Sequence, residues 1–259
     1  MTLHIIPDID NPEVYKGLIQ REGLRLEYND FFVPKLLDNE DEVRQKIEFY
    51  KNNGLCHKED TLHGPFFDIC LFSFDSKIRT VSEERVEHSI RIAKALGSAA
   101  VIIHTNYIPT FVDDDYRRHW IEANESFIRK MRAGYPDVNI YMENMFDTEP
   151  YYLEELAKRL TDDEGFGVCL DYAHANVFGT CELREWIRCL APHTRHLHIN
   201  DNNLKRDEHL PLGMGSIDYN TFFNKYFGEF DDPSILLEVK GIEAIETSIA
   251  YLKTYGIRW

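Results

Sequence analysis

The chain has 259 residues, 43% of them hydrophobic, and a formal net charge of −16 at pH 7. This length and apolar content suit one large barrel or two small domains and exclude disorder, and no apolar run approaches the roughly 20 residues of a membrane helix. The negative charge disfavours the phosphate attraction used by many nucleic-acid binders, so we do not expect nucleic acid as a partner.

Eight short β-rich runs recur along the chain. They are Leu3–Ile6, Leu24–Tyr28, Thr61–Phe66, Ala99–Asn106, Asn139–Asn144, Gly165–Asp171, Arg195–Asp201 and Ile235–Lys240. Their spacing of about 32 residues and the total length match the roughly 250 residues of a (β/α)8 barrel. Leu24–Tyr28 is ambiguous, because it could bury either alternate set of side chains. An open doubly wound sheet is the alternative, and the lack of a Gly-x-Gly-x-x-Gly turn disfavours it.

The segments between these runs have helical patterns. Thr80–Glu83 resembles a capping box, apolar residues share one helical face from Val86 to Leu96, and Gly97 can end that helix. Helices are also predicted for residues 112–134, 150–160 and 244–255. No linker or change in composition separates domains. Residues 1–259 are therefore predicted to form a single α/β domain, a TIM barrel.

The five cysteines form no C-x-x-C pair, so we expect neither a disulfide framework nor a thiolate metal site. The start at Met1 has no basic flank and no signal cleavage site. Both features predict a cytoplasmic protein with reduced cysteines.

Metal-compatible side chains occur where six of the predicted strands reach the surface. In a parallel barrel, functional groups come from these carboxyl ends and the loops after them. The residues are His63, His104, Glu143, Asp171, His198 and Glu238, joined by His174, Asp207 and His209 in the following loops. Imidazole and carboxylate suit zinc, manganese or iron, so the pattern predicts a site for one to three divalent ions, with zinc or manganese favoured.

Other readings of these residues compete with metal binding. A single histidine at a strand end is more often a hydrogen-bonded core residue than a ligand, and a buried ion pair is the main competitor for Glu143 and Glu238. His196 lies one pleat deeper than His198 and is predicted to belong to the barrel core. Polar residues at the same mouth are candidates for binding substrate hydroxyls, namely Asn144, Asn200 and Lys240.

Three motifs resemble the xylose isomerase-like barrel superfamily, and its sugar phosphate isomerase/epimerase branch fits best. They are Gly-Val-Cys-Leu-Asp-Tyr-Ala-His (167–174), His-Leu-His-Ile-Asn-Asp-Asn (196–202) and Asp-Glu-His-Leu-Pro-Leu-Gly-Met-Gly-Ser-Ile-Asp (207–218). The resemblance to sugar epimerases implies one ion held by Glu143, Asp171, His198 and Glu238, with the two glutamates exchanging protons. The related endonuclease IV enzymes add ligands that match His63, His104, His174, Asp207 and His209.

The leading hypothesis is a metal-dependent isomerase or epimerase of a carbohydrate, with Glu143 and Glu238 as general base and acid beside a polarised carbonyl. Two departures from the endonuclease pattern favour this branch: Met145–Pro150 replaces a Gly-rich segment, and Val239-Lys240 follows Glu238. The alternatives are phosphodiester hydrolysis at abasic DNA, which the complete nine-residue match motivates, and a barrel that binds sugar without turnover. The resemblance also makes a homodimer plausible.

Overall fold

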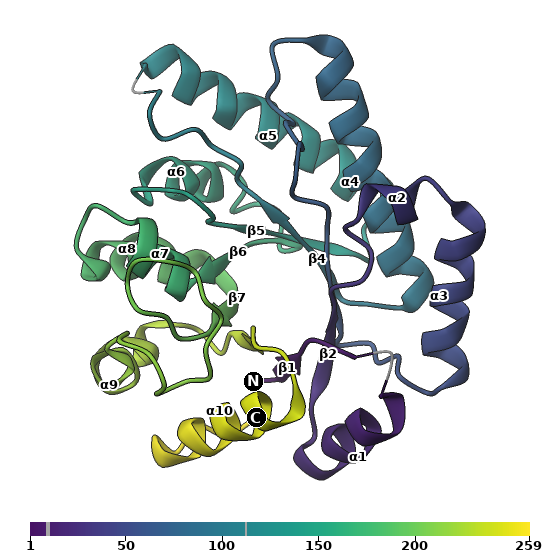
Figure 1. Cartoon of the computed structure of the whole chain (residues 1–259). Coiled ribbons are helices and arrows are strands. Elements are labelled where there is room, and N and C mark those ends of the chain that lie inside the picture. Colours follow the sequence, from purple (N-terminus) through teal and green to yellow (C-terminus); the bar gives the residue numbers. More distant parts are fainter. Residues whose placement is uncertain (9–10, 112) are drawn as a thin grey trace.

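The computed structural model describes residues 1–8, 11–111 and 113–259, in which parallel strands close into one barrel (Figure 1). Each strand pairs with the next along the chain, and β1 also pairs with β8 through Leu3 with Ile235 and Ile5 with Leu237. The strands are β1 (Leu3–Ile5), β2 (Arg25–Tyr28), β3 (Thr61–His63), β4 (Ala100–His104), β5 (Asn139–Glu143), β6 (Phe166–Asp171), β7 (Thr194–Ile199) and β8 (Ser234–Leu237). The predicted single-domain (β/α)8 barrel is confirmed, and the open-sheet alternative is wrong because β8 closes onto β1.

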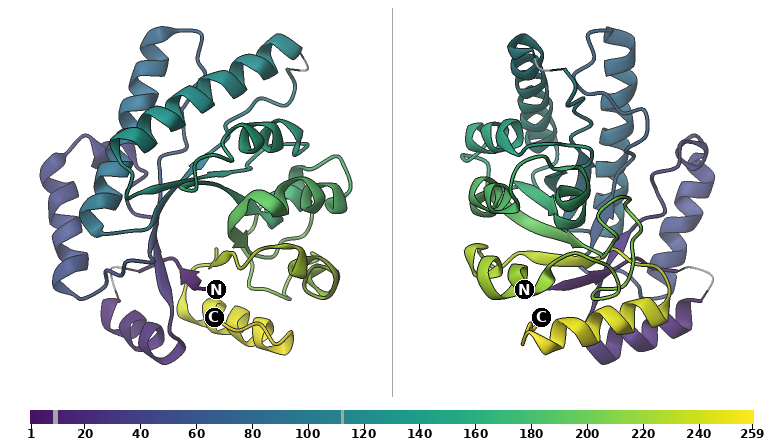
Figure 2. Two further views of the ribbon diagram at one scale, coloured as in Figure 1. Left: turned by 180° about the vertical axis from the view of Figure 1, so that it is seen from behind. Right: turned by 60° about the vertical axis from the view of Figure 1, so that its left-hand side comes forward.

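Helices surround this barrel on its outside (Figure 2). They are α1 (Pro12–Glu22), α2 (Pro34–Leu37), α3 (Glu40–Asn52), α4 (Ser76–Leu96), α5 (Asp114–Gly134), α6 (Tyr151–Arg159), α7 (Tyr172–Phe178), α8 (Leu183–Leu190), α9 (Tyr219–Thr221) and α10 (Ile242–Thr254). Both chain ends lie side by side next to α10 (Figures 1 and 2). Among the described residues, no helix has the length and hydropathy needed to cross a membrane.

The strands are almost completely buried, since one set of side chains packs under the helices and the other fills the barrel. In β4 and β6 every residue is buried. Several strands are shorter than predicted. β3 stops before Gly64-Pro65, where proline cannot donate to a ladder, and β4 stops before Asn106, whose φ of 45° leaves the extended region. These early ends place His63 and His104 at the last positions of their strands.

The helix between β3 and β4 begins earlier than its predicted capping box. Asp75 is the N-cap of α4 and accepts a hydrogen bond from the Lys77 N–H at 2.8 Å. The Thr80 hydroxyl donates to the Ser76 carbonyl one turn back, so Thr80 lies inside the helix and the predicted cap is wrong. Gly97 ends the helix at a φ of 80°, as predicted.

The other predicted helices agree with the structure to within two residues. The helix over 150–160 corresponds to α6, and the helix over 244–255 corresponds to α10, which begins at Ile242. The helix over 112–134 corresponds to α5, which begins after the Asp113 cap; residue 112 lies outside the described residues.

Candidate metal centre

The structure brings all nine predicted ligands together at the carboxyl ends of the strands. Four of them end their strands, namely His63, His104, Glu143 and Asp171. His198 is the penultimate residue of β7, and Glu238 directly follows β8. Most of the nine line a cavity of about 730 Å³ that opens at this end of the barrel.

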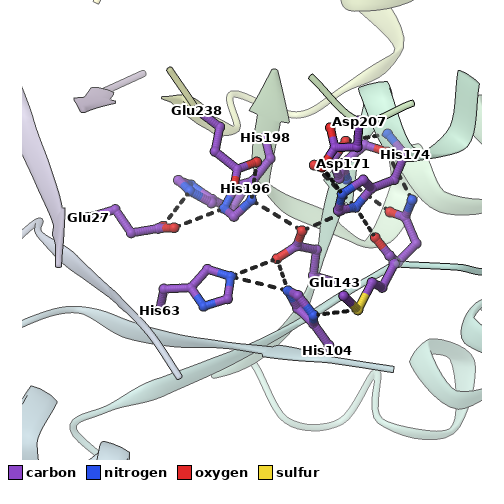
Figure 3. A network of polar contacts seen from close by, with 12 residues as sticks. Glu27, His63, His104, Glu143, Asp171, His174, His196, His198, Asp207 and Glu238 are labelled. Carbon is purple, nitrogen blue, oxygen red and sulfur yellow. Dashed lines mark hydrogen bonds and ion pairs between the residues drawn. The ribbon is translucent and has the colours of Figure 1, made fainter. Parts of the chain in front are cut away.

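Glu143 lies at the centre of the group, and its two oxygens face different histidines (Figure 3). Glu143 Oε2 is 3.1 Å from His104 Nε2 and 3.5 Å from His63 Nε2. Glu143 Oε1 is 3.3 Å from His198 Nδ1 and 3.6 Å from His174 Nδ1. Each oxygen of the carboxylate therefore faces its own pair of histidines.

Among the described residues, three sets of ligand atoms are compact enough to hold an ion, and two of these sets contain Glu143. The first comprises His63, His104 and Glu143, the second Glu143, Asp171, His198 and Glu238, and the third Cys169, His196 and His198; within each set the ligand atoms lie within 4.8 Å of one another. The second set is the one that the resemblance to epimerases implied.

Another group of candidate ligands joins His174 of α7 to two residues from the loop after β7. Asp207 Oδ2 lies 3.2 Å from His174 Nε2 and 2.7 Å from His209 Nε2. His209 also reaches the second set, because its Nδ1 lies 3.9 Å from Glu238 Oε1. His174 is held in place by Asp171, whose side chain caps α7 and accepts from the His174 N–H at 2.6 Å.

The residues fit divalent ions. Several of the buried polar atoms that have no hydrogen-bond partner among the described residues belong to the candidate ligands: both oxygens of Glu143, Asp171 Oδ2, His198 Nδ1, Asp207 Oδ1 and Glu238 Oε2. Leaving such atoms unpaired in a dry interior costs roughly 1–3 kcal/mol each, and more for charged groups. Ligation by zinc or another divalent ion would satisfy these atoms.

Burial and crowding shift the pKa values strongly. Burial raises the pKa of Asp171 to about 8, and Glu238 and Glu143 add to this while His174 opposes it. Burial would also raise the pKa of Glu143, but His198 and His104 hold it well below its usual value. Although burial opposes it, Asp171 and its neighbours raise the pKa of His174 well above the ordinary value. Without metal, protons on histidines thus balance the carboxylates, and metal binding must displace these protons.

The three residues predicted to bind substrate differ from one another in burial and in hydrogen bonding. The Asn144 amide donates to the Asp171 carbonyl and accepts from the Asp171 N–H, both at 2.9 Å. These bonds use the side chain to tie β5 to β6 and to fix Asp171, and its role in substrate binding stays a prediction. Lys240 is exposed and lines the cavity. Asn200 is fully buried, and its side-chain amide has no partner among the described residues.

Two residues near the centre were not identified from the sequence. Glu27 is a buried carboxylate of β2 that faces His196 and His198. Asp201, next to the predicted motif histidines, binds the backbone of the loop that carries Asp207. A charged residue inside an apolar strand was the available signal for Glu27. His196 lies in the barrel core, as predicted.

Comparisons with known proteins agree with the fold. A family model described as xylose isomerase-like TIM barrel matches residues 22–255. The chain is 29% identical over 206 residues to the uncharacterized protein MJ1311 of Methanocaldococcus jannaschii, covering 76% of this chain and 70% of that protein. It is also 29% identical over 170 residues to a probable endonuclease 4 of Mycobacterium ulcerans, covering 61% of this chain and 64% of that protein.

Solved structures share the whole barrel. The TTHB071 protein of Thermus thermophilus, soaked with ZnCl2, superposes with a TM-score of 0.77 at 23% identity over 98% of both chains. A D-tagatose 3-epimerase-like protein gives a TM-score of 0.73 at 24% identity, covering 98% of this chain and 97% of the other. At these identities the likeness is one of fold. The named neighbours include epimerases and probable endonucleases, which supports an enzyme in general.

Proposed function

Since the chain belongs to the xylose isomerase-like TIM barrel family, we propose that it is a metal-dependent enzyme that holds two or three divalent ions and hydrolyses a phosphoester. The observation that carries this proposal is the Glu143 carboxylate, which lies between two pairs of histidines. A site for one ion would use only one of these two sides of the carboxylate for ligation.

The charge of the centre accommodates more than one ion. Glu143, Asp171, Asp207 and Glu238 bring four carboxylates together, three of them buried. With one divalent ion, protons on histidines that hold no ion, such as His174 and His209, would have to balance the remaining negative charge. With two ions the metal charge itself would balance four carboxylates, and with three it would leave a positive centre. A positive or neutral centre suits an anionic phosphoester, whereas a neutral sugar does not require it.

The residues around the ions would have distinct roles. Bound divalent ions would supply a water of lowered pKa and positive charge beside the leaving oxygen. His63, His104 and Glu143 would hold one side of the centre, while His174, Asp207 and His209 would hold the other. Phe66 covers His63 and His104, with ring centroids 5.6 and 5.1 Å apart, and so limits the access of water to them. Lys240, at the mouth of the cavity, is the residue we assign to a phosphate oxygen.

The test is to count ions and assay cleavage on the same preparation. Protein loaded with zinc alone or manganese alone is expected to hold at least two ions per chain and to cleave bis(p-nitrophenyl) phosphate. An abasic duplex is the second substrate, because the charge of −16 favours a small phosphoester over DNA. His104→Ala should lose an ion and most of the cleavage. His88→Ala, which removes a buried histidine of α4 outside the centre, should lose neither. One ion per chain without cleavage would overturn the proposal.

The isomerase or epimerase that the sequence favoured is the second candidate. Its support is that Glu143 and Glu238 lie 3.3 and 3.5 Å from the same His198 Nδ1, so two carboxylates flank one ligand position. The two carboxylates could then act as base and acid on a carbohydrate. Exchange of solvent deuterium into a ketose, lost in Glu143→Gln, would identify this reaction. A homodimer also stays a prediction, which light scattering would test.

A further inference from the structure

A buried carboxylate lies deeper in the barrel than the nine candidate ligands. Glu27 of β2 is fully buried and pairs in register with Thr61, two residues before His63. Its Oε2 accepts from the Thr61 hydroxyl at 2.7 Å and lies 3.1 Å from His196 Nε2, while its Oε1 lies 3.2 Å from His198 Nε2 (Figure 3). Glu27 therefore faces the ring nitrogen of His198 that points away from the centre.

We propose that Glu27 positions His198 for metal binding through Nδ1 and thereby sets the affinity of the centre. This inference rests on the proposed metal site. A histidine that ligates through Nδ1 carries its proton on Nε2, and the group that accepts this proton fixes both the tautomer and the orientation of the ring. In this barrel the accepting atom is Glu27 Oε1.

The surroundings of Glu27 leave Oε1 available for His198. An ionised carboxylate cannot donate, so the contact with His196 requires a proton on His196 Nε2. On the other side of the ring, His196 Nδ1 lies 2.6 Å from Ser234 Oγ. Thr61 and His196 thus occupy Oε2 and hold the carboxylate in one orientation. Neither His198 Nε2 nor Glu27 Oε1 makes a well-aligned hydrogen bond among the described residues, and at 3.2 Å the two atoms are left to each other.

Charge also favours Glu27 over the other polar neighbour of His198. Cys169, His196 and His198 form a compact buried group. A thiol sulfur is only a weak acceptor, whereas a carboxylate oxygen is a strong one. Glu27 Oε1 lies 3.2 Å from His198 Nε2. A charged acceptor raises the basicity of the imidazole it binds, and so strengthens ligation.

The decisive variant is Glu27→Gln, which keeps the shape but has one acceptor oxygen. The N–H2 group of the glutamine must then face a donor. It faces either His198 Nε2 or the pair formed by the Thr61 hydroxyl and His196 Nε2, and one of these contacts is lost. With zinc as the probe and a chromophoric chelator as competitor, we expect affinity to fall about 10- to 100-fold. Loading with cobalt should also change the visible spectrum, which reports the ligand geometry and does not depend on turnover. Glu27→Asp, which keeps the charge, should recover part of the affinity.

Asp60→Asn is the matched control. Asp60 is as buried as Glu27 and accepts from the Leu26 N–H and the Tyr28 hydroxyl at 2.8 and 2.7 Å, without touching a candidate ligand. This variant should lose stability but keep the zinc affinity of the parent. If Glu27→Gln does not fold, Thr61→Val tests the same role of Glu27, because it removes the hydroxyl that holds the Glu27 carboxylate in place. We expect this variant to bind zinc severalfold more weakly than the parent.

The outcomes separate the inference from the metal site itself. Folded Glu27→Gln with zinc affinity within twofold of the parent would overturn the role of Glu27 and leave the proposed centre intact. Equal losses in Glu27→Gln and Asp60→Asn would also overturn it, because a general effect on folding would explain both. A parent chain that binds no zinc would refute the proposed centre and this inference with it.

Discussion

The loop that carries Asp207 and His209 depends on a residue that binds no ion. Asp201, buried two residues after the end of β7, accepts four backbone N–H bonds. Those of Asn202 and Ile217 reach Oδ1 at 2.9 and 3.1 Å, and those of Gly213 and Gly215 reach Oδ2 at 3.0 and 2.9 Å. We predict that Asp201→Asn loosens residues 202–217 and weakens the part of the centre that this loop supplies.

The free-energy cost of Asp201→Asn follows from the number of side-chain oxygens that can accept hydrogen bonds. Asparagine keeps one oxygen, so its N–H2 group faces two of the four N–H donors. Hydrogen bonds to a charged group contribute about 1.5–3 kcal/mol each. Gly213 and Gly215 lie on an exposed part of the loop, where water replaces some of the loss. We therefore expect Asp201→Asn to lower the free energy of local opening of this loop by about 2–4 kcal/mol. This corresponds to a roughly 30- to 900-fold larger population of the open state, and so to hydrogen exchange faster by the same factor.

Hydrogen exchange measures this opening directly. Amides of residues 202–217 in Asp201→Asn should exchange faster by that factor, and zinc stoichiometry should fall, while the strands keep their protection. Asp218→Asn is the control: Asp218 is an exposed cap that accepts from the Thr221 N–H at 2.9 Å, and its loss should cost no more than about 1 kcal/mol. Exchange within twofold of the parent, together with unchanged zinc content, would refute the reasoning.

Three further predictions concern other parts of the barrel. Gly215→Ala should lower the thermal midpoint by an amount equivalent to about 1–3 kcal/mol, because a Cβ there would lie 2.4 Å from Asp201 Oδ1; an unchanged melt would argue against this close contact. Chelator treatment should destabilise zinc-loaded protein against urea, and the effect should be smaller in His104→Ala; equal effects would mean that His104 holds no ion. Burial and a neighbouring histidine lower the pKa of His4 to about 4. The unfolded chain therefore takes up a proton near pH 6.5 that the folded chain refuses, so stability falls between pH 6.5 and 4 by up to about 3 kcal/mol. In His4→Gln the urea midpoint should therefore change less with pH across that range than in the parent. An equal change with pH in the variant and the parent would contradict the assignment.

The strands were predictable because a parallel barrel buries them on both sides and makes them apolar runs. The same property explains why Glu27 was missed. In Leu24–Tyr28 the alternating pattern cannot show which set of side chains faces the barrel interior, since Leu26, Glu27 and Tyr28 are all buried. The start of α4 was misplaced because Thr80–Glu83 and Asp75 are both acceptable local caps, and only packing decides between them.

The candidate ligands were predictable in kind and place, since a strand end fixes where His104 or Glu143 must point. The backbone bonds of Asn144 could not be predicted, because a side-chain amide at a barrel mouth can bind a ligand or the neighbouring backbone, and the residue type is the same in both cases. Its two bonds to Asp171 depend on how closely β5 and β6 approach at their ends.

The number of ions is the property that separates the two proposed functions, and ligand types alone do not determine it. Both functions use Glu143, Asp171, His198 and Glu238. The hydrolytic function would also use His63 and His104, and it would gain a further ion where Asp207 and His209 come close to His174 and Glu238. That approach is set by Asp201 and the two glycines it binds, which carry no ligand chemistry. Substitution of Asp201 or Gly215 is therefore expected to remove this further ion from a related barrel while all nine ligands remain.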